Sequence, residues 1–245
     1  TTPDGGIYDD TVMLRHGPTD FKIVVNAACA AQDWRLLLEG LDAFGHDKGV
    51  SIHLQTERSL IALQGPKAEA VLKNLVRHPS KLDSMKFMYG HEMEFKNFSE
   101  PMFVTRCGYT GEDGFEVSMK NSDAVAVTEE MLENEDCKLL GLGARDSLRL
   151  ESGLCLYGND ITQDTSPVEA GLLWTIGKRR RNKGGFPGAS VIQEQIKNGV
   201  ERKRIGFKLK GPRPSEGSAI YNTDEESIGK VTSVVYSPML QHPIG

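Results

Sequence analysis

The sequence predicts an α+β protein built from several domains. Its 245 residues and 38% hydrophobic content are enough for one large domain or two to three small ones. Apolar segments with strand and helix periodicity follow one another without the regular alternation of a doubly wound sheet. The last part of the chain contains short strand-like segments typical of a small β domain. No internal repeat or low-complexity tract is present.

The N-terminal region is predicted to form a hairpin followed by a helix. Two apolar segments, Ile7–Leu14 and Phe21–Asn26, flank a Gly-Pro turn signal and are expected to be its strands. Ala30–Phe44 carries a tryptophan and leucines at helical spacing, and we expect this helix to end at Gly45.

Two adjacent carboxylates, Asp9 and Asp10, are then expected at the beginning of the first strand. Successive side chains of a strand point to opposite faces. Only one of the two should therefore face a given cavity, so we do not expect a carboxylate dyad.

The middle of the chain is predicted to contain strands, helices and a glycine-rich turn. Pro66 occupies the usual first-turn position of a helix. The segment GYTGEDG separates two apolar segments and predicts a second hairpin. The expected strands are Val50–Gln55, Leu60–Gln64, Phe103–Arg106 and Phe115–Met119, and the expected helices are Lys67–Leu75 and Ala124–Glu133.

The turn and strand around GYTGEDGFE contain three carboxylates. Glu112 and Asp113 lie at the turn, where we expect solvated charges. Glu116 lies between two apolar residues of a strand, so the strand is either at a sheet edge or directs this carboxylate at a partner. Its two oxygens suit a planar group with two parallel N–H donors, such as an arginine or the amino-pyrimidine edge of a pterin.

The segment GLGARDSLRLESGLCLYGND predicts a short helix over Ala144–Glu151. Arg145 and Arg149 are one turn apart, and Asp146 can pair with Arg149 at i+3. Arg145 then stands alone at the positive end of the helix dipole. A salt bridge to another strand or a lone-pair-rich ligand would satisfy it.

The remaining chain is predicted to be irregular at first and then to form a helix and a small β domain. The basic segment Lys178–Arg181 is either a solvated stretch or a docking site for an acidic partner or a polyglutamate tail. The expected elements are an irregular stretch at Tyr157–Val168, an apolar segment at Leu172–Ile176, a helix at Gly188–Asn198 and strands at Arg204–Leu209, Ala219–Tyr221 and Ser227–Val235.

Composition excludes several classes of function. A net charge of −5 argues against nucleic acid as the main ligand, and no apolar run is long enough to span a bilayer. The four cysteines are scattered, which indicates neither a zinc site nor a disulfide framework and favours a reducing compartment. The histidines lack metal-ligand spacing. GLGARD has Asp146 where a dinucleotide-binding motif has its third glycine. Motifs for nucleophilic or metal catalysis are absent.

Seven segments occur in an order that resembles the aminomethyltransferases (T-proteins) of the glycine cleavage system, over roughly residues 5–240. The segment GKRRR followed by FPGA is closer to the mitochondrial forms. The seven segments are GGIYDD, VVNAA, ALQGP, TRCGYTGEDGFEV, GLGARDSLRLESGLCLYGND, TSPVEAGLLWTIGKRRR and FPGA.

The resemblance implies three domains in a cloverleaf around a folate-binding channel, where the three polar clusters converge. Residues 1–53 with 159–196 would form a second α+β domain that lacks its N-terminal part, and 54–158 the central folate-binding α+β domain. Residues 197–245 would form an incomplete C-terminal β-barrel domain. The chain begins without methionine and stops after a strand and turn, so we expect an internal fragment, whose activity alone is open.

The resemblance also assigns site residues. Asp10 matches the catalytic aspartate of the family, Glu116 the glutamate that holds the amino-pyrimidine edge of the pterin, and Arg145 the folate-binding arginine. Trp174 could equally be a buried core tryptophan. The positions that match the lining of the folate pocket are Val24, Asn26, Tyr109 and Trp174.

The implied activity transfers an aminomethyl group from the lipoyl arm of the H-protein to tetrahydrofolate. Ammonia is released and 5,10-methylenetetrahydrofolate forms, as part of glycine catabolism and one-carbon metabolism. Tetrahydrofolate is a co-substrate, and neither a metal nor a protein nucleophile is required. The implied partners are lipoylated H-protein and folate, without nucleic acid or membrane. The implied location is the mitochondrial matrix in a eukaryote and the cytoplasm otherwise.

Two other functions have to be weighed against this one. A non-catalytic folate-binding relative linked to iron–sulfur cluster assembly would carry a KGCYxGQE-like segment, whereas this chain has GYTGEDGFE together with Asp10 and Arg145. The chain could also be the folate domain of a larger dimethylglycine or sarcosine oxidising enzyme. One departure from the family is Val234, where glycine is usual, which would be strained if the turn needed a positive φ.

Overall fold

The computed structural model describes all 245 residues, which form two compact units. Unit 1 comprises Thr1–Val12, Val24–Val50 and Gly153–Gly245, and unit 2 comprises Met13–Ile23 and Ser51–Ser152. The three-domain division expected from the family resemblance, with domain boundaries at residues 54, 159 and 197, stays a prediction. No helix of the chain combines the length and apolar character needed to cross a bilayer.

Unit 2 is built on a four-stranded antiparallel sheet in the order β3-β6-β5-β4. The predicted hairpin around GYTGEDG is confirmed, since β5 and β6 pair directly. The strand β4 has only one strongly apolar residue, and the sequence did not indicate it. The four strands are β3 (Arg58–Gln64), β4 (Gly90–Met93), β5 (Met102–Thr105) and β6 (Gly114–Lys120).

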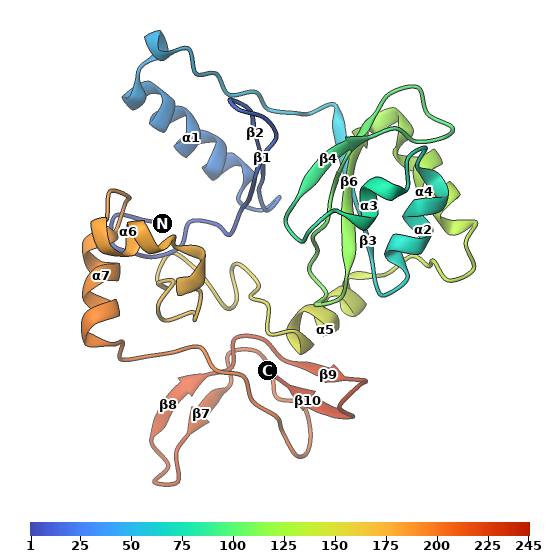
Figure 1. Ribbon diagram of the computed structural model, residues 1–245. Coiled ribbons are helices and arrows are strands. Elements are labelled where there is room, and N and C mark those ends of the chain that lie inside the picture. The colour runs from blue at the N-terminus through green and yellow to red at the C-terminus, as the bar shows by residue number, and fades with distance from the viewer. The chain divides into compact units, whose positions relative to one another are not determined.

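Helices cover one face of this sheet (Figure 1). The predicted helices at 67–75 and 124–133 are confirmed as α2 and α4, which contact each other and the sheet. The helical segments of this part of the chain are α2 (Ala68–Leu75), α3 (Ser80–Asp83), η2 (Asn121–Asp123) and α4 (Ala124–Leu132).

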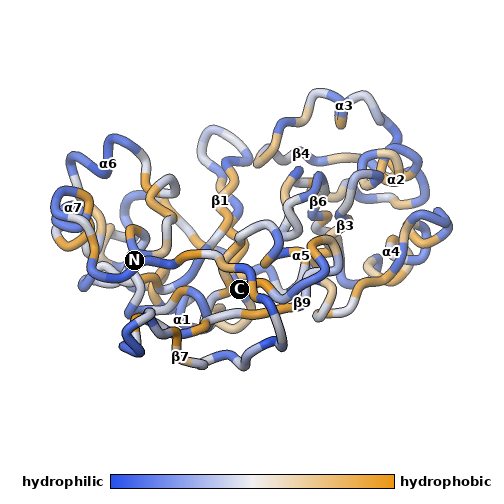
Figure 2. The backbone as a smooth tube through the Cα atoms, turned by 90° about the horizontal axis from the view of Figure 1, so that it is seen from below, coloured by the Kyte–Doolittle hydropathy of each residue, from blue (hydrophilic) through white to orange (hydrophobic).

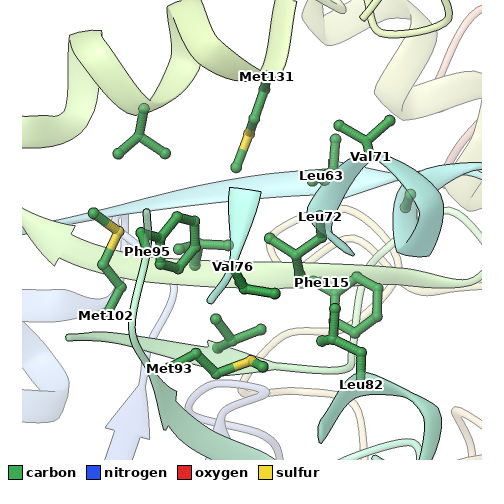
Figure 3. Packing of buried hydrophobic residues seen from close by; sticks show 14 of the residues in the cluster. Leu63, Val71, Leu72, Val76, Leu82, Met93, Phe95, Met102, Phe115 and Met131 are labelled. Carbon is green, nitrogen blue, oxygen red and sulfur yellow. The ribbon is translucent and has the colours of Figure 1, made fainter. Parts of the chain in front are cut away.

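The core of unit 2 lies between this sheet face and the helices. Side chains from β6, α2 and α4, including Phe115, Leu72 and Met131, point toward one another (Figure 3). Phe115 and Leu72 are fully buried. Each such apolar side chain contributes about 1.5–3 kcal/mol through removal from water. This core holds β6, the strand that carries Glu116.

The tip of the N-terminal hairpin covers part of the opposite face of the sheet. Lys22 Nζ lies 3.7 Å from the ring centroid of Phe103, and the His16 ring packs edge-on against the same ring at 4.9 Å. The hairpin consists of β1 (Val12–Arg15) and β2 (Phe21–Val24), which are shorter than predicted. Asp9 and Asp10 therefore precede the strand.

The arginine-containing helix is confirmed as α5 (Leu142–Glu151), which begins two residues before the predicted start. Gly141 is extended and precedes it, and Gly153 follows with a φ of 71°. The left-handed conformation at Gly153 suits the end of a helix, because glycine adopts it without strain.

Unit 1 contains the long helix α1 (Ala30–Phe44), for which the predicted bounds are confirmed. Arg204–Leu209 is not a strand but holds a single bridge at Lys208, and the predicted strand at 227–235 ends at Lys230. Its other elements are η1 (His46–Lys48), η3 (Leu173–Thr175), α6 (Lys178–Lys183), α7 (Ala189–Asn198) and the hairpins β7–β8 (Ala219–Tyr221, Ser227–Lys230) and β9–β10 (Val235–Ser237, His242–Ile244).

The predicted strand at Val50–Gln55 is absent, and this segment is irregular. Five of its six residues are exposed, including Val50 and Leu54. An apolar run predicts a strand only where a neighbouring strand can pair with it, and no strand pairs with this one.

Candidate functional site

The glycine-rich turn of unit 2 is shaped around the side chain of Gln64. The Gln64 amide donates to the carbonyl oxygens of Cys107 and Phe115 at 3.0 and 3.3 Å. A Cβ at Gly108 would lie 1.7 Å from Gln64 Oε1, and a Cβ at Gly114 would lie 2.5 Å from it. These two glycines therefore leave the space that Gln64 occupies.

The same turn is attached to the end of α5. Ser152 Oγ donates to the carbonyl oxygen of Thr110 at 2.8 Å. Gly111 has a φ of 77°, and a Cβ there would lie 1.9 Å from Ser152 Oγ. Gly111 thus allows both the left-handed turn and the close approach of Ser152, and this contact fixes the turn against the arginine helix.

Arg145 and Tyr109 are brought together by this arrangement. The Arg145 guanidinium carbon lies 4.7 Å from the centroid of the Tyr109 ring. Arg145 is exposed, and it forms no ion pair with a carboxylate of the chain. The interpretation of Arg145 as a salt bridge to another strand of its own unit is therefore wrong. A stacked guanidinium with its donors open to solvent can receive an anionic or lone-pair-rich ligand.

The second arginine of the helix has a structural role. Arg149 is 1% exposed, and its Nε lies 2.7 Å from Asp146 Oδ1. The predicted i, i+3 pair is therefore confirmed.

Glu116 lies on a central strand and not at a sheet edge. Its backbone is paired with Ala62 of β3 on one side and with Thr105 of β5 on the other. The carboxylate is half-buried on the face opposite the core residues Phe115 and Val117. Of the two interpretations of a charged residue in this strand, the structure excludes the edge position.

Cys107 is the buried neighbour of Glu116. It lies two residues beyond the end of β5, and its thiol is within hydrogen-bonding reach of the Glu116 carboxylate. Burial, followed by the charge and hydrogen bonding of Glu116, raises the pKa of the Cys107 thiol to about 12. The thiol stays protonated at neutral pH and can donate to one oxygen of Glu116.

One carboxylate of the turn, Asp113, is exposed as expected but also has an ion-pair partner. Asp113 accepts two hydrogen bonds from Arg106, at 2.8 and 2.6 Å. Arg106 also pairs with Glu69 at 2.7 Å and donates to two backbone carbonyls. The Arg106 guanidinium lowers the pKa of Asp113, with burial opposing the shift. Turn statistics describe residues within the turn, so they could not indicate that Arg106 also binds Glu69, which is distant in the sequence.

The acidic part of the candidate site lies in unit 1, where both adjacent aspartates contact Asn26. The Asn26 side-chain amide donates to Asp9 Oδ1 at 2.7 Å and to Asp10 Oδ1 at 2.9 Å. Both carboxylates thus face the Asn26 side chain, whereas strand alternation predicted that they would point to opposite faces. Strand alternation does not apply to them, because the strand begins only at Val12.

The two carboxyl groups differ in proton affinity. Burial and the negative charge of Asp9 raise the pKa of Asp10, although its side chain reaches the surface. Burial also opposes ionisation of Asp9, but hydrogen bonds from Asn26 outweigh it and lower the pKa of Asp9. Asp9 therefore carries the negative charge, and Asp10 is the one more able to hold a proton.

The two other predicted pocket residues of unit 1 are Val24 and Trp174. Val24 ends β2 and is half-buried. Trp174 lies on η3 and is 73% exposed, so its interpretation as a core tryptophan is wrong. Asp10, Val24, Asn26 and Trp174 belong to one unit and Tyr109, Glu116 and Arg145 to the other. The convergence of the two sets in one channel stays a prediction.

The chain has no group of three or more His, Cys, Asp or Glu side chains arranged to hold a metal ion. Two surface hollows of about 360 and 340 Å³ lie beside α4 and at the end of α7. None of the predicted site residues lines either hollow.

Comparison with known proteins decides the family. Residues 1–180 match the GCVT N-terminal domain, and residues 202–245 match the glycine cleavage T-protein C-terminal barrel domain. The chain belongs to the glycine cleavage T-protein family. The predicted α+β fold class of this family, with a C-terminal barrel domain, is thereby confirmed.

Several relatives of the T-protein family are similar over almost the whole chain. The mitochondrial aminomethyltransferases of Mesembryanthemum crystallinum and Solanum tuberosum are 47% and 46% identical over 100% of this chain. That of Mus musculus is 44% identical over 98% of it. The chain spans about 60% of the length of these curated relatives.

A solved T-protein structure has the same fold. The glycine cleavage system aminomethyltransferase T from Bartonella henselae matches with a TM-score of 0.85 and 37% identity, over 99% of this chain and 64% of that one. Val234, which departs from the usual family glycine, is not strained, because the non-glycine residues with positive φ are Met88, Glu225 and Gln241. Valine is therefore compatible with the backbone at this position.

Sequence reasoning missed three polar residues beside the predicted T-protein site. Asp9 was considered only as the neighbour of Asp10. Cys29, which precedes α1, and Asp33 in its first turn carried no motif. Both are buried next to Asp9. A buried aspartate in the first turn of an otherwise amphipathic helix was the available signal.

Proposed function

We propose that this chain provides the folate-binding and catalytic residues of an aminomethyltransferase. The observation that supports this most directly is Arg145, which is exposed, stacked on Tyr109 and without an intrachain carboxylate partner. The relatives above are named aminomethyltransferases, which favours this function over the iron–sulfur and oxidising-enzyme alternatives.

The substrates in this proposal are tetrahydrofolate and the aminomethyl group on the lipoyl arm of the H-protein. Bound tetrahydrofolate supplies the nitrogen atoms that accept the one-carbon unit, while ammonia leaves and the lipoyl dithiol remains. In a eukaryote, this reaction would take place in the mitochondrial matrix. The relatives are named mitochondrial, which supports the organelle.

Glu116 and Arg145 are proposed to bind the folate. The Glu116 carboxylate can accept two parallel N–H donors from the amino-pyrimidine edge of the pterin. Cys107 occupies one side of this carboxylate as a neutral donor and adds no competing charge. Arg145, held by the Tyr109 ring, supplies donors for lone pairs of the folate. Val24, Asn26 and Trp174 are proposed as further lining residues.

Asp10 is proposed to orient the folate near N10 and to assist proton transfer as ammonia departs. Its raised pKa favours this role, because a general acid or base works best when its pKa approaches the working pH. The carboxyl also reaches the surface of its unit, where substrate can approach it.

Calorimetry with tetrahydrofolate on the purified full-length protein tests the binding residues. Glu116→Ala and Arg145→Ala should each weaken binding by about tenfold or more, as expected for loss of a charged hydrogen bond. Undiminished binding in both variants would refute the assignment. Asp10→Asn tests the catalytic role, and we expect turnover to fall by about 10²–10⁴-fold. Turnover within about threefold of wild type would contradict that role.

Lipoylated H-protein is the proposed macromolecular partner, and α6 is the proposed docking site. The helix is hydrophilic along its length (Figure 2). Arg180 and Arg181 donate to backbone carbonyls of their own unit, at distances down to 2.9 and 2.7 Å. The other three cations, Lys178, Arg179 and Lys183, are exposed and form no ion pair with the chain. These three are the ones available to an acidic partner.

A further inference from the structure

Asp9 is the most extensively bonded carboxylate beside the candidate catalytic carboxyl, and the proposed reaction does not use it. Its Oδ2 accepts the backbone N–H of Asn26 at 3.0 Å, and its Oδ1 accepts the Asn26 side-chain amide at 2.7 Å. These two bonds close a ring between the residues. The orientation of the Asn26 amide is therefore fixed by Asp9.

The second N–H of this amide is directed at Asp10. Asn26 Nδ2 lies 2.9 Å from Asp10 Oδ1 and 3.4 Å from the Asp10 carbonyl oxygen. A primary amide carries two N–H donors, so it can bind both carboxylates at once. The position of the Asp10 carboxyl consequently depends on that of Asp9.

The first turn of α1 and the residue that precedes the helix contact Asp9 as well. The Cys29 thiol and the Asp33 carboxyl both hydrogen-bond to Asp9. Cys29 is 5% exposed and Asp33 is 7% exposed, and Asp33 Oδ2 is buried without a hydrogen-bond partner. A buried carboxyl group in contact with a second, half-buried one is stable when the two share a proton. Asp9 is therefore held rigidly between α1 and Asn26.

We propose that Asp9 is a positioning residue, which fixes the carboxyl of Asp10 through the side-chain amide of Asn26. This inference rests on the proposed function of Asp10. It assigns Asn26 a role in holding the acidic group as well as in lining the pocket.

The charge of Asp9 has a second effect on Asp10. After burial, it is the largest influence that raises the pKa of Asp10. Removal of this charge should lower that pKa and move the acid limb of the pH–rate profile to lower pH. The other titratable groups that face Asp9, Asp10 or Asp33 are Cys29, Tyr157 and the α-amino group of Thr1.

The test compares Asp9→Asn, Asp9→Glu and Asp10→Asn with the matched control Asp4→Asn in the full-length protein. Asp4 is exposed and lies outside this hydrogen-bond network. The kcat and the KM for tetrahydrofolate are measured from about pH 5 to pH 9, a range that spans the titration of a raised carboxyl. Thermal unfolding shows that each variant is folded.

We expect Asp9→Asn to lower kcat by about tenfold, with KM for tetrahydrofolate within about threefold, as for loss of orientation in the transition state. Its acid limb should move down by about half a pH unit or more. Asp9→Glu keeps the charge but displaces it, so kcat should fall by about fivefold or more with little change of the acid limb. Asp4→Asn should match wild type in kcat and in the position of the acid limb.

Two results would overturn the inference, and they are distinguishable from each other. Wild-type kcat and acid limb in Asp9→Asn, with Asp10→Asn strongly impaired, would remove the role of Asp9 and leave the proposed function intact. Wild-type turnover in Asp10→Asn would remove both. If Asp9→Asn does not fold, wild-type kcat in Asp9→Glu would by itself refute the positioning role.

Discussion

The guanidinium of Arg145 lies 4.7 Å from the centroid of the Tyr109 ring, which orders an exposed cation without neutralising it. A carboxylate partner would have used the donors that a ligand needs. An aromatic ring holds the long side chain without pairing with it as a carboxylate would, so the donors stay available to a ligand.

Replacement of Tyr109 should show how much this stacking contributes. Tyr109→Leu should weaken tetrahydrofolate binding by about two- to fivefold, the size expected for an exposed cation–π contact. Tyr109→Phe keeps the ring and should lose less affinity. Calorimetry at equal pH and salt measures both, and equal losses in the two variants would contradict a contribution from the ring.

Substitution of Gly111 should lower the stability of unit 2. Gly111→Ala places a Cβ in a left-handed residue and against Ser152, so we expect a loss of unfolding free energy of about 1–2 kcal/mol. A Cβ at Gly143 of α5 would meet no atom within 4 Å, so Gly143→Ala is the matched control. The control should be neutral or stabilising by up to about 1 kcal/mol. Urea unfolding gives both values, and equal midpoints would be inconsistent with this explanation.

The pair formed by Arg106 and Asp113 is expected to stabilise unit 2. Arg106→Met removes the partner of two carboxylates and should lower the unfolding free energy by about 1.5–3 kcal/mol. Lys67 pairs with Asp136 at an exposed site, so Lys67→Met should cost less than about 1 kcal/mol. Chemical denaturation of both variants provides the comparison, and a larger loss in Lys67→Met would exclude the proposed difference.

The carboxyl of Asp33 should make stability depend on pH. Burial, and then the contact with Asp9, raises the pKa of Asp33 to about 6, whereas an aspartate in the unfolded chain has a pKa of about 3.9. The folded protein thus binds the proton more tightly, and its unfolding free energy should fall as pH rises from about 4 to about 6.

Asp33→Asn removes this titration while keeping a donor for Asp9. We expect a flatter dependence of the melting temperature between about pH 4 and pH 7, and a gain over wild type that is largest above about pH 6. Asp4→Asn serves as the control and should follow the wild-type curve. A wild-type slope in Asp33→Asn would show that Asp33 does not hold the proton.

Charge reversal on α6 tests the proposed contact with H-protein. The triple variant of Lys178, Arg179 and Lys183 to glutamate should weaken binding by about tenfold at low salt and less at high salt. The control reverses three exposed cations elsewhere in unit 1, namely Lys197, Lys203 and Lys210. Equal effects of the two triple variants would indicate a nonspecific dependence on net charge.

The sequence predicted the parts of the molecule where local pattern and global packing agree. The helix α1 has the predicted bounds, and Asp146 pairs with Arg149 as expected, because both depend on neighbours within a few residues. The family motifs also identified the fold class. These predictions required no knowledge of distant contacts.

The predictions failed where contacts with residues distant in the sequence determine the local structure. Val50–Gln55 has the composition of a strand but no strand to pair with. Asp113 is exposed as expected, but its ion pair with Arg106, which also binds Glu69 of α2, was not predicted. Asp9 and Asp10 were assigned to opposite faces of a strand, yet the strand begins after them, and Asn26 joins the two.

The side chain of Gln64 between Gly108 and Gly114 ties together three positions that are far apart in the chain. A methyl group at position 108 has no room while the glutamine is present, and a shorter residue at position 64 would leave a void lined by backbone carbonyls. Each substitution alone is therefore unfavourable, whereas a shorter residue at position 64 makes room for a methyl group at position 108. Substitutions at positions 64, 108 and 114 should therefore be correlated among related sequences, because the size of each residue limits the size of the others.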